Sequence, residues 1–165
     1  MTALLAVDLG VRTGFACWGE DGRLRWYRSR NFGAAARLRR AIPALLDEVP
    51  DLARLVLEGG GPLADAWAHE GDRRALTVQR VSAEQWRALF LLPREHGSGP
   101  QMKAVADRLA RRAIAFGEAP RPTSLRHDAA EAILIGLWGA LSAWASLATN
   151  WKVTSPLKSL AGTKR

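Results

Sequence analysis

Three apolar stretches near the N-terminus, residues 4–8, 15–18 and 23–30, have the length and patterning of β-strands. In the third stretch, large apolar residues alternate with basic ones, as in a strand that buries one face. An Asp-Gly pair at residues 21–22 favours a hairpin between the second and third stretches. The pattern therefore predicts an antiparallel meander whose first strand ends at Asp8.

From residue 34 the apolar positions change to helical spacing and then to a short strand. The buried face of this predicted helix consists of Leu38, Ile42, Leu45, Leu46 and Val49. Residues 55–57 then form a continuous apolar run, typical of a strand that is buried on both faces. That strand ends at Glu58, and the Gly-Gly-Gly-Pro sequence at residues 59–62 predicts a loop.

The second half of the chain alternates helical and extended patterns. We expect a short helix within residues 63–74, a strand over 76–81 and a helix start capped by Ser82. Two longer helices are predicted over about residues 101–116 and 124–147. The order is three antiparallel strands, helix, strand, helix, strand and two further helices. It predicts an α/β fold with a mixed five-stranded sheet and helices on both faces.

The length of 165 residues fits one domain that needs no disulfide. Cys17, the single cysteine, is expected to be a small buried apolar residue. We assign residues 1–148 to the folded domain and 149–165, which are basic and lack acids, to a flexible tail. No apolar stretch reaches the roughly 20 residues needed to span a bilayer, and residues 1–7 lack a basic leader, so a cytoplasmic protein without a membrane partner is expected.

The net charge of +8, from 24 basic and 16 acidic residues, favours a polyanionic partner such as nucleic acid. The charge by itself has a second explanation, a basic surface that only keeps the protein soluble. Candidate phosphate contacts are Arg37, Arg39, Arg40, Arg108, Arg111 and Arg112, with Lys152, Lys158, Lys164 and Arg165 in the tail. Each of these side chains could also be part of a solvated helix face.

Four acids fall where elements of the predicted fold could bring them together. Asp8 and Glu58 each end a strand, and the carboxyl ends of neighbouring parallel strands meet at one edge of a sheet. Asp128 and Glu131 are three residues apart near the start of the last helix, hence on one face. Buried carboxylates need a partner or a cation, and Mg²⁺ prefers oxygen ligands. Two such ions, roughly 3.5–4 Å apart, can hold the attacking and leaving oxygens of phosphoryl transfer.

Each acid also has a structural alternative. Asp8 and Glu58 could simply be turn residues, and the pair Asp128 and Glu131 could cap a helix without any metal. The sequence contains no His/Cys cluster with zinc spacing, no phosphate-binding Gly-x-x-x-x-Gly-Lys-Ser/Thr loop and no Gly-x-Ser-x-Gly elbow. The joint pattern of the four acids therefore carries the prediction of a metal site.

The order of these motifs resembles that of the RuvC-type Holliday-junction resolvases in the RNase H-like superfamily, which include small phage-type members. The resemblance covers roughly residues 3–145. It rests on Ala-Val-Asp-Leu-Gly at 6–10, Thr-Gly-Phe-Ala at 13–16, Leu-Val-Leu-Glu at 55–58, Val-Ser-Ala-Glu-Gln-Trp-Arg at 81–87 and His-Asp-Ala-Ala-Glu-Ala at 127–132. Lys103 stands near the place of a basic residue that assists catalysis in the family.

The resemblance implies an RNase H-like sheet and a homodimeric endonuclease that cuts four-way DNA junctions by paired nicks. It implies two Mg²⁺ ions per site, with Mn²⁺ able to substitute, held by Asp8, Glu58, Asp128 and Glu131. Asp8 would bridge both ions, and Lys103 would stabilise negative charge on the phosphate. The products would carry 5′-phosphate and 3′-hydroxyl ends.

The chain departs from the family at several positions. Glu131 stands where an aspartate is usual, and His127 is an alternative ligand. The aromatic residue that relatives place just after the glutamate is missing, and Trp67 is either its substitute or a core residue. The segment 62–77 is also shorter than the family helix that helps form the dimer.

Three other functions compete with junction cleavage. The first is a nuclease of the same superfamily that acts on flaps, forks or RNA–DNA hybrids, and the second is a junction-binding protein without activity. The third is a sugar-kinase or actin-like ATPase, whose phosphate loops also begin Asp-x-Gly. That class needs two such domains around its nucleotide, and 165 residues hold only one.

Overall fold

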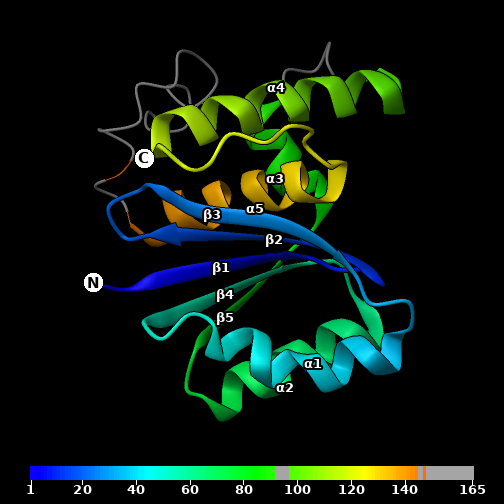
Figure 1. Cartoon of the computed structure of the whole chain (residues 1–165), viewed down its shortest axis with the longest axis vertical. Helices are drawn as coiled ribbons and strands as arrows, with labels where there is room; N and C mark the ends of the chain where they lie inside the picture. The colour runs from blue at the N-terminus through cyan, green and yellow to red at the C-terminus, as the bar shows by residue number, and fades with distance from the viewer. Residues whose placement is uncertain (92–96, 145–146, 148–165) are drawn as a thin grey trace, which may run out of the picture.

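A five-stranded mixed sheet forms the centre of the molecule (Figure 1). The computed structural model describes residues 1–91, 97–144 and 147. The strands are β1 (Ala3–Asp8), β2 (Arg12–Gly19), β3 (Leu24–Asn31), β4 (Leu52–Glu58) and β5 (Thr77–Val81). Their order across the sheet is β3-β2-β1-β4-β5; β1, β2 and β3 pair antiparallel, and β4 and β5 continue parallel to β1. The predicted meander and mixed sheet are confirmed.

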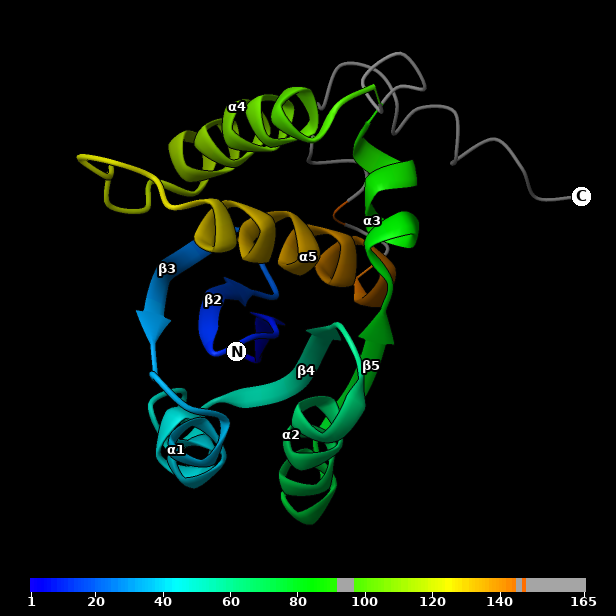
Figure 2. The same cartoon turned by 90° about the vertical axis from the view of Figure 1, so that its right-hand side faces the viewer.

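Helices cover both faces of the sheet (Figures 1 and 2). On one face lie α1 (Ala35–Asp47) and α2 (Gly61–Arg73), the crossovers that return the chain to β4 and β5. On the other face α5 (His127–Ala143) packs against the sheet, and α3 (Ala83–Phe90) and α4 (Gly99–Gly117) pack against α5. None of the helices in the described part of the chain is both long and apolar enough to span a membrane.

Strand alternation divides the core into two layers. In β1, Leu4 and Ala6 face α5, whereas Leu5 and Val7 face α1 and α2. The five apolar residues expected on the buried face of the first helix are all buried, and so is Cys17. Burial on both faces explains why the central strands are almost continuously apolar.

Helix boundaries differ from the sequence prediction at three places. Residues 61 and 62 belong to α2, because Pro62 lacks the amide hydrogen that the first turn would leave unpaired. Three helices follow β5 where the chain order predicted two, since the segment capped by Ser82 is the separate helix α3, with a complete capping box. The last helix spans His127–Ala143, shorter than expected. The expected tail 149–165 lies outside the described residues.

Glycines let α5 pack closely on the sheet. A Cβ atom on Gly14 of β2 would lie 1.9 Å from the backbone oxygen of Asp128, at the first turn of α5. Farther along α5, Cβ atoms on Gly136 and Gly139 would collide with Trp18 and Val56. The helix therefore contacts the strand backbone directly at Gly14, which brings its first turn onto the end of β1.

Replacing Gly14 by alanine should push the first turn of α5 away from the sheet. We expect Gly14→Ala to lower the free energy of unfolding by about 1–3 kcal/mol, because neither colliding partner is a flexible side chain. Chemical denaturation with circular dichroism would measure this change. Gly99→Ala is the matched control, because its Cβ would meet nothing within 4 Å. Equal stability of the two variants would contradict the close approach described here.

Candidate metal centre

The acids of β1 and β4 lie in one row of residues that crosses the sheet. In the register of the sheet, Ser29 of β3 pairs with Gly14, Gly14 with Asp8, Asp8 with Glu58, and Glu58 with Val81 of β5. Because side chains two residues apart share a face, Asp8 and Glu58 point to the same side as Ala6 and Val56, which is the side that α5 covers. Parallel pairing of β1 and β4 thus makes these two acids neighbours.

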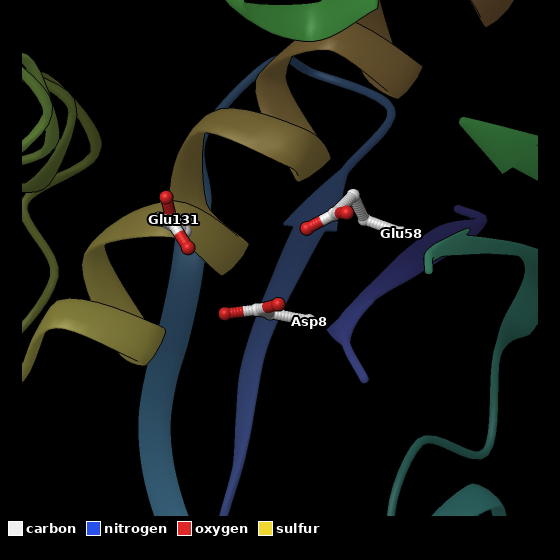
Figure 3. A group of neighbouring side chains, drawn as sticks. All are labelled: Asp8, Glu58 and Glu131. Carbon is white, nitrogen blue, oxygen red and sulfur yellow. The ribbon is translucent and has the colours of Figure 1, made fainter. Parts of the chain in front are cut away.

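The first turns of α5 complete an acidic cluster. Carboxylate oxygens of Asp8, Glu58 and Glu131 lie within 4.8 Å of one another, and Figure 3 shows the three side chains around a common space. Glu131 is buried, and Asp8 and Glu58 are half-buried. Three of the four predicted acids therefore converge from β1, β4 and α5.

The fourth acid, Asp128, lies beside this group. Its carboxylate accepts a hydrogen bond from the hydroxyl of Ser29, which stands in the same row of the sheet as Asp8. The negative charge of Asp128 also contributes to raising the pKa of Asp8. Asp128 thus adjoins the cluster and is fixed to the edge strand β3.

Glu131 is held by two basic side chains. Nη2 of Arg87, on α3, donates to Oε1 of Glu131 at 2.9 Å. Nε2 of His127, one turn earlier on α5, lies 3.3 Å from the same oxygen. The sequence left His127 open as a possible ligand, and in the structure it contacts an acid of the cluster.

Crowding of negative charge perturbs the pKa values of the two strand acids. Burial, followed by the charges of Glu131 and Glu58, raises the pKa of Asp8 to about 9. Burial and Glu131 also raise the pKa of Glu58, an effect that the hydrogen bond with Asp8 and the charge of Arg87 partly offset. Without a cation, the cluster therefore retains a proton near neutral pH.

A divalent cation fits the chemistry of this donor set. The cluster offers oxygen ligands, which Mg²⁺ and Mn²⁺ prefer, and no sulfur ligand. The raised pKa of Asp8 indicates negative charge that the protein alone leaves poorly compensated. Asp8, Glu58 and Glu131 are the residues that could hold such an ion, with Asp128 adjacent.

Lys103 and the candidate arginines lie on the surface. Lys103 is exposed on α4, and among the described residues its side chain makes no hydrogen bond or ion pair. α4 ends beside Leu24, at the turn between β2 and β3, so its first turns extend toward the end of the sheet that carries the acids (Figure 1). The arginines of α1 and those of α4 lie on opposite faces of the sheet, and the candidate tail residues lie outside the described part of the chain.

Trp67 is a core residue. Its side chain is fully buried, and its ring centroid lies 6.1 Å from that of Phe15. It cannot act as an exposed wedge, which decides between the two roles that the sequence allowed. α2 turns this tryptophan inward because Trp67 lies on the same face as Ala64 and Gly71, which are also buried.

Sequence reasoning missed three residues that shape the cluster: Ser29, Arg87 and Gly14. Ser29 and Arg87 contact acids 99 and 44 positions away, so no local spacing links them. Gly14 and Arg87 entered the prediction only as members of the segments 13–16 and 81–87, with no role of their own. The strand register could have revealed Ser29 and Gly14, because both share a row with Asp8.

The arrangement of strands and helices is that of the RNase H-like fold. Within this class, the chain has the RuvC-type form of the fold. It superposes on the structure described as "T. thermophilus RuvC in complex with Holliday junction substrate" with a TM-score of 0.59, covering 89% of this chain and 96% of that one at 14% identity.

Two viral structures are matched more loosely. The catalytic core domain of BIV integrase gives a TM-score of 0.34 at 14% identity, covering 81% of this chain and 80% of that chain. The simian T-cell lymphotropic virus intasome gives 0.31 at 8% identity, covering 83% of this chain and 47% of that one. No protein-family model matches the chain, and no curated protein matches its sequence.

The raised pKa of Asp8 predicts how the stability of the metal-free protein depends on pH. A carboxyl whose pKa is higher in the folded state stabilises that state while protonated, and this contribution is lost as the pH rises from about 4 toward 9. Asparagine is neutral throughout this window. We therefore expect Asp8→Asn to have a higher Tm than the wild type at pH 8–9, with the difference shrinking toward pH 4.

Thermal unfolding in a chelating buffer across this pH range would measure the effect. Asp72→Asn, at an exposed position near the end of α2, is the control and should follow the wild type. A constant difference between Asp8→Asn and the wild type from pH 4 to pH 9 would contradict the proposed proton on Asp8.

Proposed function

We propose that this protein is a metal-dependent endonuclease that hydrolyses phosphodiesters in branched DNA, with four-way junctions as its substrate. The observation that carries the proposal is the convergence of Asp8, Glu58 and Glu131 within 4.8 Å on a RuvC-type fold. The net charge of +8 supports a polyanionic substrate. The matched RuvC structure is described as a complex with a Holliday junction, which supports the choice of substrate.

In the proposed mechanism, the acids prepare a site for the scissile phosphate. Bound divalent cations, Mg²⁺ or Mn²⁺ and two per site, would supply positive charge that activates water and stabilises the developing charge on the phosphate. Asp8 and Glu58 hold their carboxylates on a rigid pair of strands, and Glu131 and Asp128 add theirs from α5. Such preorganisation lowers the cost of arranging charges during the reaction.

The remaining residues of the proposal act on the DNA. Lys103 would approach the phosphate and stabilise its negative charge, and the exposed arginines of α1 and α4 would hold the DNA backbone without reading sequence. Two nicks in a symmetric junction require two active sites, so we propose a homodimer. A cytoplasmic location, expected from the sequence, belongs to the same proposal.

Cleavage of a synthetic four-way junction tests this function directly. With Mg²⁺ or Mn²⁺ we expect nicked products with 5′-phosphate ends, and with a chelator none. Asp8→Asn should reduce the rate by several orders of magnitude while binding stays near normal, because asparagine is a poorer metal ligand. Flaps, forks and RNA–DNA hybrids of equal length are the comparison substrates. Metal-independent cutting, or full activity of Asp8→Asn, would refute the proposal, and binding without cleavage would indicate a junction-binding protein.

Binding to the junction should weaken steeply with salt. A contact surface dominated by phosphates releases counterions, so the logarithm of affinity falls linearly with that of salt, with a slope of roughly −0.9 per phosphate contacted. Fluorescence anisotropy between 50 and 200 mM salt, with Ca²⁺ as the metal, would measure this slope. An affinity that stays flat over this range would argue against a backbone-dominated interface.

A further inference from the structure

Arg87 places a permanent positive charge inside the acidic cluster. Its Nη2 donates to Glu131 at 2.9 Å, and its charge also acts on Glu58. The Arg87 side chain is 28% exposed and that of Glu131 12%, so their ion pair is only partly screened by water. A guanidinium in this position compensates charge that a metal ion would otherwise neutralise.

The Arg87 guanidinium is held in place, and only part of its hydrogen-bonding capacity is taken up by Glu131. Its central carbon lies 5.1 Å from the ring centroid of Trp86, a fully buried residue, so the indole provides a fixed platform for the side chain. The bond to Glu131 uses Nη2. Among the described residues the Arg87 guanidinium makes no other hydrogen bond. Because Nη2 carries a second hydrogen, one edge of the guanidinium, Nε with Nη2 or Nη1 with Nη2, stays open to bind two oxygens of an oxyanion.

We propose that Arg87 is a catalytic residue that binds the scissile phosphate. In the metal-free protein it is paired with Glu131, and it shifts toward the phosphate when Glu131 takes up a cation. The physical reason is that the Glu131 carboxylate would then contact two positive charges, the metal ion and the guanidinium, which repel each other. A phosphate carries negative charge and offers two oxygens that a guanidinium can bind in a bidentate manner. This inference rests on the proposed function, and it assigns a role to the last residue of the segment 81–87.

The chain offers a closely matched control for Arg87. On α2, Nη2 of Arg73 bonds Oε1 of Glu70 at 2.7 Å, and the Glu70 side chain is 11% exposed, almost the same as Glu131. Each glutamate keeps a second basic partner, Arg74 or His127, when the arginine is replaced. Arg73 lies on the opposite face of the sheet and has no part in the acidic cluster.

Metal binding without DNA gives the first test. Arg87→Gln, Arg87→Lys, Arg73→Gln and the wild type would be titrated with Mn²⁺ by calorimetry, after circular dichroism confirms that each is folded. Removing a competing positive charge should make Arg87→Gln bind Mn²⁺ roughly tenfold more tightly, with Arg73→Gln unchanged. Weaker Mn²⁺ binding by Arg87→Gln would overturn the proposal, because Arg87 would then support Glu131 as a ligand instead of competing with the metal.

DNA binding and cleavage give the second test. With Ca²⁺, Arg87→Gln should bind the junction roughly tenfold more weakly than Arg73→Gln. At saturating Mn²⁺ its cleavage rate should fall about 10²–10³-fold, with partial recovery in Arg87→Lys, which keeps the charge but not the fork. Cleavage by Arg87→Gln at the wild-type rate would overturn the role of Arg87 and leave the proposed function standing. If the wild type cleaves no substrate, the proposed function fails, and junction binding alone tests the role of Arg87. A loss of binding in Arg87→Gln but not in Arg73→Gln supports the phosphate contact, and equal binding by the two variants overturns it.

Discussion

Carboxylates that share one half-buried space repel one another, and this repulsion is the constraint that the rest of the structure must satisfy. Asp8 and Glu58 are direct neighbours in the sheet, and α5 brings Glu131 against both. In water such a group would separate, but here the backbone of three elements holds it together. The protein offsets the repulsion with the positive charge of Arg87, with the Ser29 hydroxyl on Asp128 and with a proton on Asp8. The stability of the fold and the chemistry of the cluster are therefore linked.

The crossover from the meander to β4 decides which acids can meet. α1 covers one face and returns the chain so that β4 lies parallel to β1, and this direction brings Glu58 beside Asp8 at the same end. An antiparallel β4 would have placed Glu58 at the far end of the strand. The parallel pair also leaves the opposite face of the sheet open for α5, whose first turn carries Asp128 and Glu131.

Much of this arrangement was predictable because it follows from local patterns. Strand ends located Asp8 and Glu58, and helical spacing placed Asp128 and Glu131 on one face. The functions of Ser29 and Arg87 were not predictable, because their partners are distant in sequence and the pairing of β3 depends on a register shift near Cys17. Trp67 shows a related limit: whether an aromatic residue of a helix faces the core depends on the neighbours of the whole helix, here Phe15 of β2.

The contact at Gly14 fixes how far the acids of the sheet lie from those of α5. Where a helix packs on a sheet through large side chains, each substitution changes the distance between them. Here the first turn of α5 lies on bare backbone, so the separation between Asp8 and the helix is set by two main chains in contact. The acids therefore keep their spacing only while Gly14, Gly136 and Gly139 carry no Cβ atom, because each of the three brings α5 against the strands.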